Sequence, residues 1–278
     1  MLQALPFGDV AAIVAVLMVT GVCVGFVSGL LGIGGGGLLV PVLYEVFGFL
    51  DVADENRFHL AIGTSLAVMI PTTLRSYFAH RSGGTADGHF VRRLALPVLA
   101  GVIIGSVIAK ASSDIVLKCV WVTFSLLLVI KLFFGRESWR LGDDVPSSWV
   151  VEGYGVLVGA ISTIMSVGGG AYITALLTLY GRSIKQAVGT SVGFGPIIAI
   201  PGMVGFMWAG WNVEGLPLGS IGYVNLLGIA ALVPTSVYMA PIGARAAQGI
   251  SRRNLEIAMG SFIFLVSIRF MVSIAADL

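Results

Sequence analysis

The chain has 278 residues, of which 57% are hydrophobic and only 11% are charged, and its formal net charge is +2. A soluble domain carries about 25% charged residues, so this composition excludes a soluble globular protein. The small net charge excludes an extended basic surface, and we expect no nucleic-acid partner. Long apolar runs recur along the chain and predict a multi-pass protein of the lipid bilayer.

Ten apolar segments are predicted in chain order, and the longer ones can cross a hydrocarbon core of about 30 Å. They cover residues 10–31, 37–48, 60–79, 92–110, 115–134, 149–166, 168–180, 187–208, 221–245 and 255–275. The segments 37–48 and 168–180 are too short for an untilted span and indicate half-helices or re-entrant pieces. The expected fold is therefore an all-α polytopic membrane protein with broken or re-entrant helices.

A polar linker at 135–148 divides the chain into an N-terminal membrane repeat, 1–134, and a C-terminal membrane repeat, 149–278. Each part holds about five apolar segments. If the sequences of the two parts are similar at a constant offset, the chain contains an internal repeat.

Two ordered sequence matches support this repeat. GFVSGLLGIGGG at 25–36 matches GAISTIMSVGGG at 159–170, and AIGTS at 61–65 matches AVGTS at 187–191. Identical GGG and GTS triplets in the same order are unlike a chance match of small residues. The sequence therefore predicts two structurally related halves.

The charges of equivalent short loops predict that the halves are inverted. The acidic loop at 48–60 corresponds to the basic loop at 181–186, and the basic loop at 80–93 corresponds to 209–221, where the only charge is Glu214. Short loops rich in Lys and Arg stay in the cytoplasm. We therefore expect the N-terminus outside and the central linker in the cytoplasm.

The two glycine runs are the first candidate site. They comprise Gly34, Gly35 and Gly36 in the first half and Gly168, Gly169 and Gly170 in the second. Each glycine disfavours a continuous helix by about 1 kcal/mol relative to alanine, and the helix beginning after such a break presents free N–H groups that favour an anion. Close helix packing is the alternative interpretation of the glycines.

The two GTS triplets are the second candidate. Thr64 and Ser65, like Thr190 and Ser191, lie near the start of an apolar segment, where hydroxyls can cap a helix or contact an oxyanion. Alternatively, these hydroxyls bond back to their own helix and need no ligand.

Charged residues inside apolar segments form the third candidate. Arg75 and Arg269 could serve an anion pathway, or they could pair with an acid or extend to the membrane surface. Glu45 could carry a coupling proton, or it could be a surface acid at the end of its segment.

Enzyme functions lack the residues that they need. GIGGGG at 32–37 matches the dinucleotide fingerprint G-x-G-x-x-G, but a long apolar run precedes it, and SVGGGA in the second half breaks the pattern. HExxH and GxxxxGK[ST] are missing from the sequence, and its three histidines are scattered. We expect neither an enzyme nor a bound cofactor or metal.

The ordered motifs also resemble a known family. GLLGIGGGGLLVPVL with AIGTS, SVGGGA with AVGTS, and GSIGYVNL at 219–226 are similar to the TauE/SafE sulfite exporter family. The resemblance implies a bacterial or archaeal inner-membrane transporter for sulfite, organosulfonates or other sulfur anions. It points to the glycine runs and the GTS hydroxyls as the site. Pro41 follows the first glycine run as in the family, whereas Ala175 stands at its counterpart.

Inverted repeats with broken helices are typical of secondary transporters that bind substrate at the repeat interface. The combined prediction is a secondary transporter that moves a small anion, sulfite or an organosulfonate, by alternating access. A coupling ion such as a proton would supply the energy, and a homo-oligomer is compatible with the sequence. Two alternatives remain: an anion channel, and a non-transporting membrane scaffold or receptor.

Overall fold

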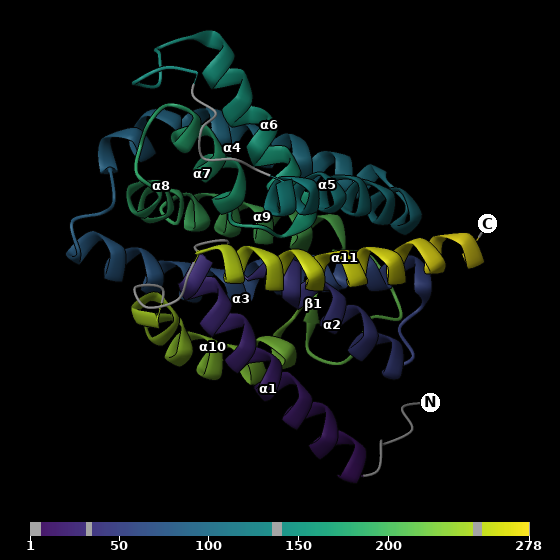
Figure 1. The fold of residues 1–278 in the computed structure, drawn as a ribbon. Helices are drawn as coiled ribbons and strands as arrows, with labels where there is room; N and C mark the ends of the chain where they lie inside the picture. The colour runs from purple at the N-terminus through teal and green to yellow at the C-terminus, as the bar shows by residue number, and fades with distance from the viewer. Residues whose placement is uncertain (1–6, 32–34, 135–140, 247–251, 278) are drawn as a thin grey trace.

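The computed structural model describes residues 7–31, 35–134, 141–246 and 252–277. Gly34, the first member of the first glycine run, lies outside this part of the chain. The described residues form helices joined by loops, with one short hairpin between two of the helices (Figure 1). The predicted all-α membrane fold is confirmed.

The helices follow the predicted segments closely. Those of the first half are α1 (Phe7–Leu31), α2 (Gly36–Phe49), α3 (Asp54–Ser82), α4 (Gly88–Ala111) and α5 (Asp114–Phe134). The second half contains α6 (Trp149–Met165), α7 (Gly170–Leu179), α8 (Ile184–Ser191), α9 (Phe194–Ala209), α10 (Leu226–Ala246) and α11 (Arg252–Asp277). As predicted, α2 and α7 are short, with 14 and 10 residues.

Two details differ from the prediction. The segment expected at 187–208 is divided at Val192 and Gly193 into α8 and α9. The segment expected at 221–245 begins with the antiparallel hairpin of β1 (Ser220–Ile221) and β2 (Val224–Asn225), and its helix starts only at Leu226. Hydropathy alone misses both changes because neither interrupts the apolar composition.

Five segments of the described chain are long and apolar enough to cross a membrane: Ala12–Leu30, Gly88–Ala111, Asp114–Phe134, Lys185–Ala209 and Leu226–Gly243. Their outward faces carry exposed large apolar side chains, as on α4 and α5, and such faces suit lipid as a solvent. By contrast, α3 is the buried centre, where every residue from 58 to 69 is buried.

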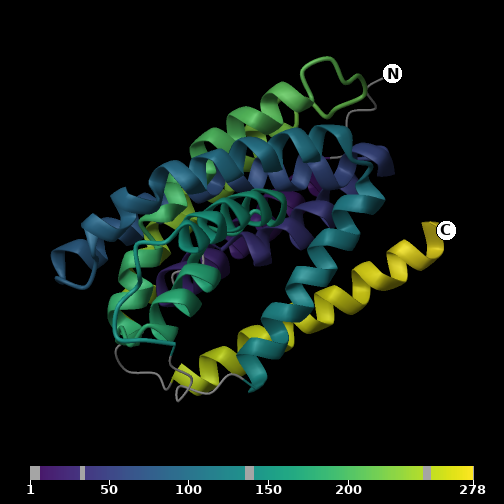
Figure 2. The same cartoon turned by 90° about the horizontal axis from the view of Figure 1, so that it is seen from above.

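The main helix contacts join the two halves. Helix α1 packs along α10, α6 along α4, and α3 against α9, while α5 crosses α11 at one side of the molecule (Figures 1 and 2). Gly25 faces the backbone of Ser236 on α10, and Gly159 faces the carbonyl of Val98 on α4, so that a Cβ at either glycine would overlap the neighbouring backbone. These two glycines occupy matching positions in the sequence repeat, and they serve close packing.

The loops gather at two ends of the helix bundle. At the linker end, Arg182 of the α7–α8 loop pairs with Asp144 at 3.1 Å, and Arg93 of α4 donates to the carbonyl of Val145 at 3.3 Å. At the hairpin end, the Tyr223 hydroxyl donates to Asn56 at 2.8 Å. Loops that the charge pattern assigned to one side therefore lie together.

Candidate functional site

The two glycine runs interrupt the helices where the sequence predicts. Helix α1 ends at Leu31 before α2 begins at Gly36, and α6 ends at Met165 before α7 begins. Gly35 and Gly169 precede α2 and α7 with φ angles of +76° and +69°. L-residues with side chains rarely adopt this left-handed conformation, so both breaks need glycine at these positions.

The first break and the end of α6 meet in the buried centre. A Cβ added to Gly36 would overlap the carbonyl oxygen of Ser166, the C-cap residue directly after α6. The Ser166 hydroxyl donates to the Ser65 hydroxyl of α3 at 2.9 Å, and both serines are fully buried. The structure therefore brings Gly35, Gly36 and Ser65 together with the turn that leads into the second glycine run.

The second run is arranged in the same way in its own half. Gly168 is buried in the turn after α6, Gly169 precedes α7, and Gly170 is the first residue of α7. Thr174 of α7 donates to the hydroxyl of Ser191 at 3.0 Å, at the end of α8. Each GTS serine thus bonds to a residue beside a helix break.

The two GTS threonines tie helices together. Thr64, well inside α3, accepts a hydrogen bond from the backbone N–H of Asn225 at 2.9 Å, just before α10. Thr190, near the end of α8, accepts one from the N–H of Asp87 at 2.9 Å, just before α4. The expectation that these hydroxyls lie near a helix start is wrong, because α3 and α8 begin earlier than the apolar segments.

Replacing either threonine by valine is expected to lower the free energy of unfolding by about 1–3 kcal/mol, because a buried N–H loses its acceptor. The measurement is a denaturation titration of purified Thr64→Val and Thr190→Val in detergent. Thr123→Val is the control, since the exposed Thr123 hydroxyl bonds only to the carbonyl of Cys119 in its own helix. Equal stability of all three variants would contradict this role.

Two serines that the sequence analysis did not select lie next to the breaks. The hydroxyl oxygens of Ser28 and Ser162 are buried and have no hydrogen-bond partner among the described residues. The Ser28 Cβ lies 3.5 Å from the place of a Cβ on Gly35. Buried polar atoms are nearly always hydrogen-bonded, so this pair is available to a ligand or to water. The signal was present in the sequence, because Ser28 and Ser162 match in the repeat.

The two predicted arginines lie apart from this buried centre. Arg269 of α11 pairs with Glu45 of α2 at 3.2 Å, and both side chains are about half exposed. Arg75 is exposed on α3. The sequence left two roles open for Arg269, an anion pathway or pairing with an acid. The structure has the ion pair.

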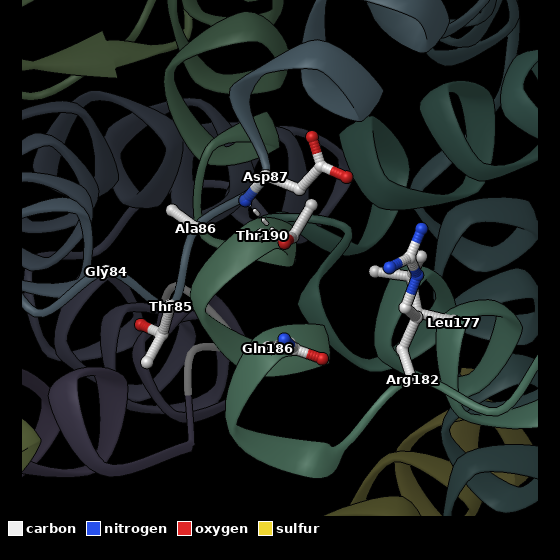
Figure 3. A pocket seen from close by; sticks show the side chains of 8 residues that line it. All are labelled: Gly84, Thr85, Ala86, Asp87, Leu177, Arg182, Gln186 and Thr190. Carbon is white, nitrogen blue, oxygen red and sulfur yellow. Dashed lines mark hydrogen bonds between the residues drawn. The ribbon is translucent and has the colours of Figure 1, made fainter.

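A polar cavity of about 130 Å³ opens at the linker end (Figure 3). Its lining comes from the α3–α4 loop, the end of α7 and helix α8, and consists of Gly84, Thr85, Ala86, Asp87, Leu177, Arg182, Gln186 and Thr190. Arg182 and Asp87 give the lining one charge of each sign, and Arg182 also pairs with Asp144 of the linker. Thr190 is thus the member of the predicted site that lines this cavity.

A buried histidine–aspartate pair at the hairpin end was also missed. Asp114, the first residue of α5, is hydrogen-bonded to the Nδ1 atom of His59 and accepts the N–H of Phe58 at 2.7 Å. The Nε2 atom of His59 lies 2.9 Å from the carbonyl of Ala109 at the end of α4. The pair therefore joins α3, α4 and α5. The sequence hid it, because Asp114 stands between two apolar segments and resembles a loop residue.

Tyr223, between β1 and β2 and outside the membrane-spanning helices, closes the hairpin over this pair. Its ring stacks on His59 with centroids 4.8 Å apart. Burial raises the pKa of its hydroxyl above the usual range, and the negative charges of Asp114 and Glu55 raise it further. The hydroxyl therefore stays protonated, and it donates a hydrogen bond to the side-chain oxygen of Asn56.

The long apolar helices, together with two interrupted helices that meet at a buried polar centre, define a multi-pass membrane protein of the transporter type. The sequence pattern described as sulfite exporter TauE/SafE matches residues 17–270. The chain belongs to this family and is a membrane transporter.

Curated relatives agree with this assignment. A "Probable membrane transporter protein" of Haemophilus influenzae is 30% identical over 259 residues, which cover 92% of this chain and 97% of the relative. A protein of the same description from Methanocaldococcus jannaschii is 27% identical, and the match covers 89% of this chain and 91% of the relative. A third, the "Probable membrane transporter protein YunE" of Bacillus subtilis, is 23% identical, and the match covers 90% of this chain and 94% of the relative. No solved structure matches the chain significantly.

Proposed function

We propose that this protein is a secondary transporter that moves a small sulfur oxyanion, sulfite or an organosulfonate, across the inner membrane of a bacterium or archaeon. The observation that carries the proposal is the meeting of the helix breaks beside two buried, unpartnered serine hydroxyls, Ser28 and Ser162. The family's description names sulfite, and an oxyanion accepts the hydrogen bonds that such hydroxyls can donate.

The helix starts at the breaks supply further donors. Helices α2 and α7 begin at Gly36 and Gly170, inside the buried centre. The first N–H groups of a helix have no partner within the helix, and the helix dipole adds partial positive charge there. A small oxyanion therefore gains backbone hydrogen bonds and favourable electrostatics without a buried cation.

We further propose that the two halves are inverted repeats that rock against each other, with the N-terminus outside and the linker in the cytoplasm. Three correspondences support this proposal. The α1–α10 contact corresponds to the α6–α4 contact, Gly25 corresponds to Gly159 in close packing, and Thr64 corresponds to Thr190 in accepting an N–H before a helix. A coupling ion such as a proton, or the membrane potential, would drive the movement.

The test is counterflow in proteoliposomes. Vesicles loaded with unlabelled sulfite are expected to accumulate ³⁵S-sulfite from outside transiently, because a carrier exchanges its substrate. Taurine and sulfoacetate are tested as competitors. A channel would give flux without counterflow, and a scaffold or receptor would give no flux with any of the three compounds; either result would overturn the proposal.

The serine pair provides a second arm of this test. The double variant Ser28→Ala with Ser162→Ala is expected to raise the half-saturation concentration of sulfite by about 100-fold or more, because two hydrogen bonds to the anion are lost and each contributes about 1.5–3 kcal/mol. Ser267→Ala is the matched control, since Ser267 is equally buried but bonds to the carbonyl of Ile263 in its own helix. Unchanged half-saturation in the double variant would exclude these hydroxyls from the site.

A further inference from the structure

A line of polar residues, three buried and one half-buried, follows one face of α3 from the glycine breaks toward the linker end. Thr72, Ser76 and His80 follow Ser65 at spacings of 7, 11 and 15 residues. At 3.6 residues per turn these four positions fall within an arc of about 80°. We call these four residues the α3 stripe. A polar face on the most buried helix of a membrane protein needs a reason, since polar groups there are costly without partners.

Helices α1 and α10 cover the stripe. The Thr72 hydroxyl lies 3.3 Å from that of Ser236 on α10, and the imidazole of His80 lies beside the backbone of Gly29 on α1. Ser28 directly precedes Gly29 in α1 and therefore lies next to the contact between His80 and Gly29. The stripe is therefore enclosed by polar positions on two neighbouring helices.

Two polar atoms along this enclosure have no partner. The hydroxyl oxygens of Ser28 and Ser76 are buried without a hydrogen bond to any described residue. Ser28 is 1% exposed and Ser76 is 0% exposed. A buried polar group left without a partner costs about 1–3 kcal/mol, and two such hydroxyls along one enclosure are suited to a polar occupant that enters and leaves.

The stripe connects the two polar features described above. At one end, Ser65 bonds to Ser166 at the glycine breaks. At the other end, the Nδ1 atom of His80 lies 3.4 Å from the hydroxyl of Thr85, which lines the cavity that also holds Arg182. A series of hydrogen-bonding groups thus links the breaks with a cavity that Arg182 and Asp87 both line.

The corresponding face in the second half is apolar. At the shift that aligns the GTS triplets, Thr72, Ser76 and His80 correspond to Ile198, Gly202 and Phe206 of α9. Both Ile198 and Phe206 are fully buried. The polar line therefore serves the linker end, while the equivalent positions toward the hairpin end are closed by hydrocarbon.

We propose that the α3 stripe, enclosed by Ser28 and Ser236, is the route by which a hydrated sulfur oxyanion passes between the linker-end cavity and the glycine breaks. This inference rests on the proposed function and adds a path to its site. Hydroxyls donate hydrogen bonds to the anion in turn, and an N–H of the imidazole does the same, so no fixed charge holds the anion in place.

Cysteine labelling tests this route. Ser28→Cys and Ser76→Cys are made singly in a chain whose native Cys23 and Cys119 are replaced by alanine. The probe is sulfonatoethyl methanethiosulfonate, a membrane-impermeant anion, applied to vesicles from the linker end. Both cysteines are expected to react at least about 10-fold faster than Ser267→Cys, which is equally buried on α11 but outside the stripe. Sulfoacetate is expected to slow the reaction.

The outcomes separate the route from the proposed function. Labelling of both stripe cysteines no faster than Ser267→Cys overturns the route, whatever the counterflow assay gives. The cationic trimethylammonium analogue is tested in the same way. If it labels both cysteines as fast as the anionic probe does, and sulfoacetate does not slow the labelling, the stripe is a water-filled crevice and the anion route is overturned. Fast labelling by the anionic probe with protection by sulfoacetate, in a protein without sulfite counterflow, supports the route and removes sulfite as the substrate.

Discussion

Gly36→Ala is expected to reduce sulfur oxyanion counterflow by about 10-fold or more. The added methyl group overlaps the carbonyl of Ser166, so the end of α6 must move away from the start of α2. Forcing a methylene-sized group into a packed interior typically costs about 1–3 kcal/mol, and here the displaced atoms are backbone atoms of the proposed site. Transport should therefore fall more than stability does.

Gly37→Ala is the matched control for this prediction. It lies one residue further along the same helix, and a Cβ there meets no atom of the described residues within 4 Å. The two variants are compared by counterflow in proteoliposomes and by their melting temperatures in detergent. If Gly36→Ala transports as fast as Gly37→Ala, the contact between the break and Ser166 has no part in transport.

Asp114→Ala is expected to lower the free energy of unfolding by about 2–6 kcal/mol, because the buried N–H of Phe58 and the buried imidazole of His59 each lose a hydrogen-bond partner, at about 1–3 kcal/mol each. Asp114 is 5% exposed and holds both His59 and the N–H of Phe58. Its loss therefore loosens the junction of α3, α4 and α5. The free energy is measured by denaturant titration in detergent micelles.

Asp54→Ala serves as the comparison, since Asp54 also begins a helix and pairs with Arg57 at 2.8 Å. Its side chain is 68% exposed, and such exposed pairs contribute about 0–1 kcal/mol. A loss of stability in Asp114→Ala no greater than in Asp54→Ala would show that the buried pair does not hold the hairpin end together.

The sequence predicted the helix breaks because their cause is local. Gly35 and Gly169 need a backbone conformation that other residues avoid, and the repeated GGG triplets marked both places. The short lengths of α2 and α7 followed from the same breaks and from the length of the apolar runs. Composition likewise sufficed for the membrane class, since lipid-facing helices must be apolar all along their outer faces.

The rest depends on contacts between distant residues, which patterns along one chain do not contain. Thr64 was associated with a helix start, whereas its partner is the N–H of Asn225 far along the chain. His59 and Asp114 form a pair only because α3 and α5 begin at the same end of the molecule. The role of Ser28 depended on burial without a partner, and a sequence gives no direct sign of that.

The main helix contacts join helices of different halves, and this has a consequence for biosynthesis. Helix α1 is made well before its packing partner α10, because most of the other helices lie between them in the chain. During insertion, Gly25 and its neighbours on α1 must therefore wait in lipid or against the insertion machinery while the intervening helices are produced. The N-terminal half has no finished fold of its own at that stage, and assembly of the protein completes only when its C-terminal helices have entered the membrane.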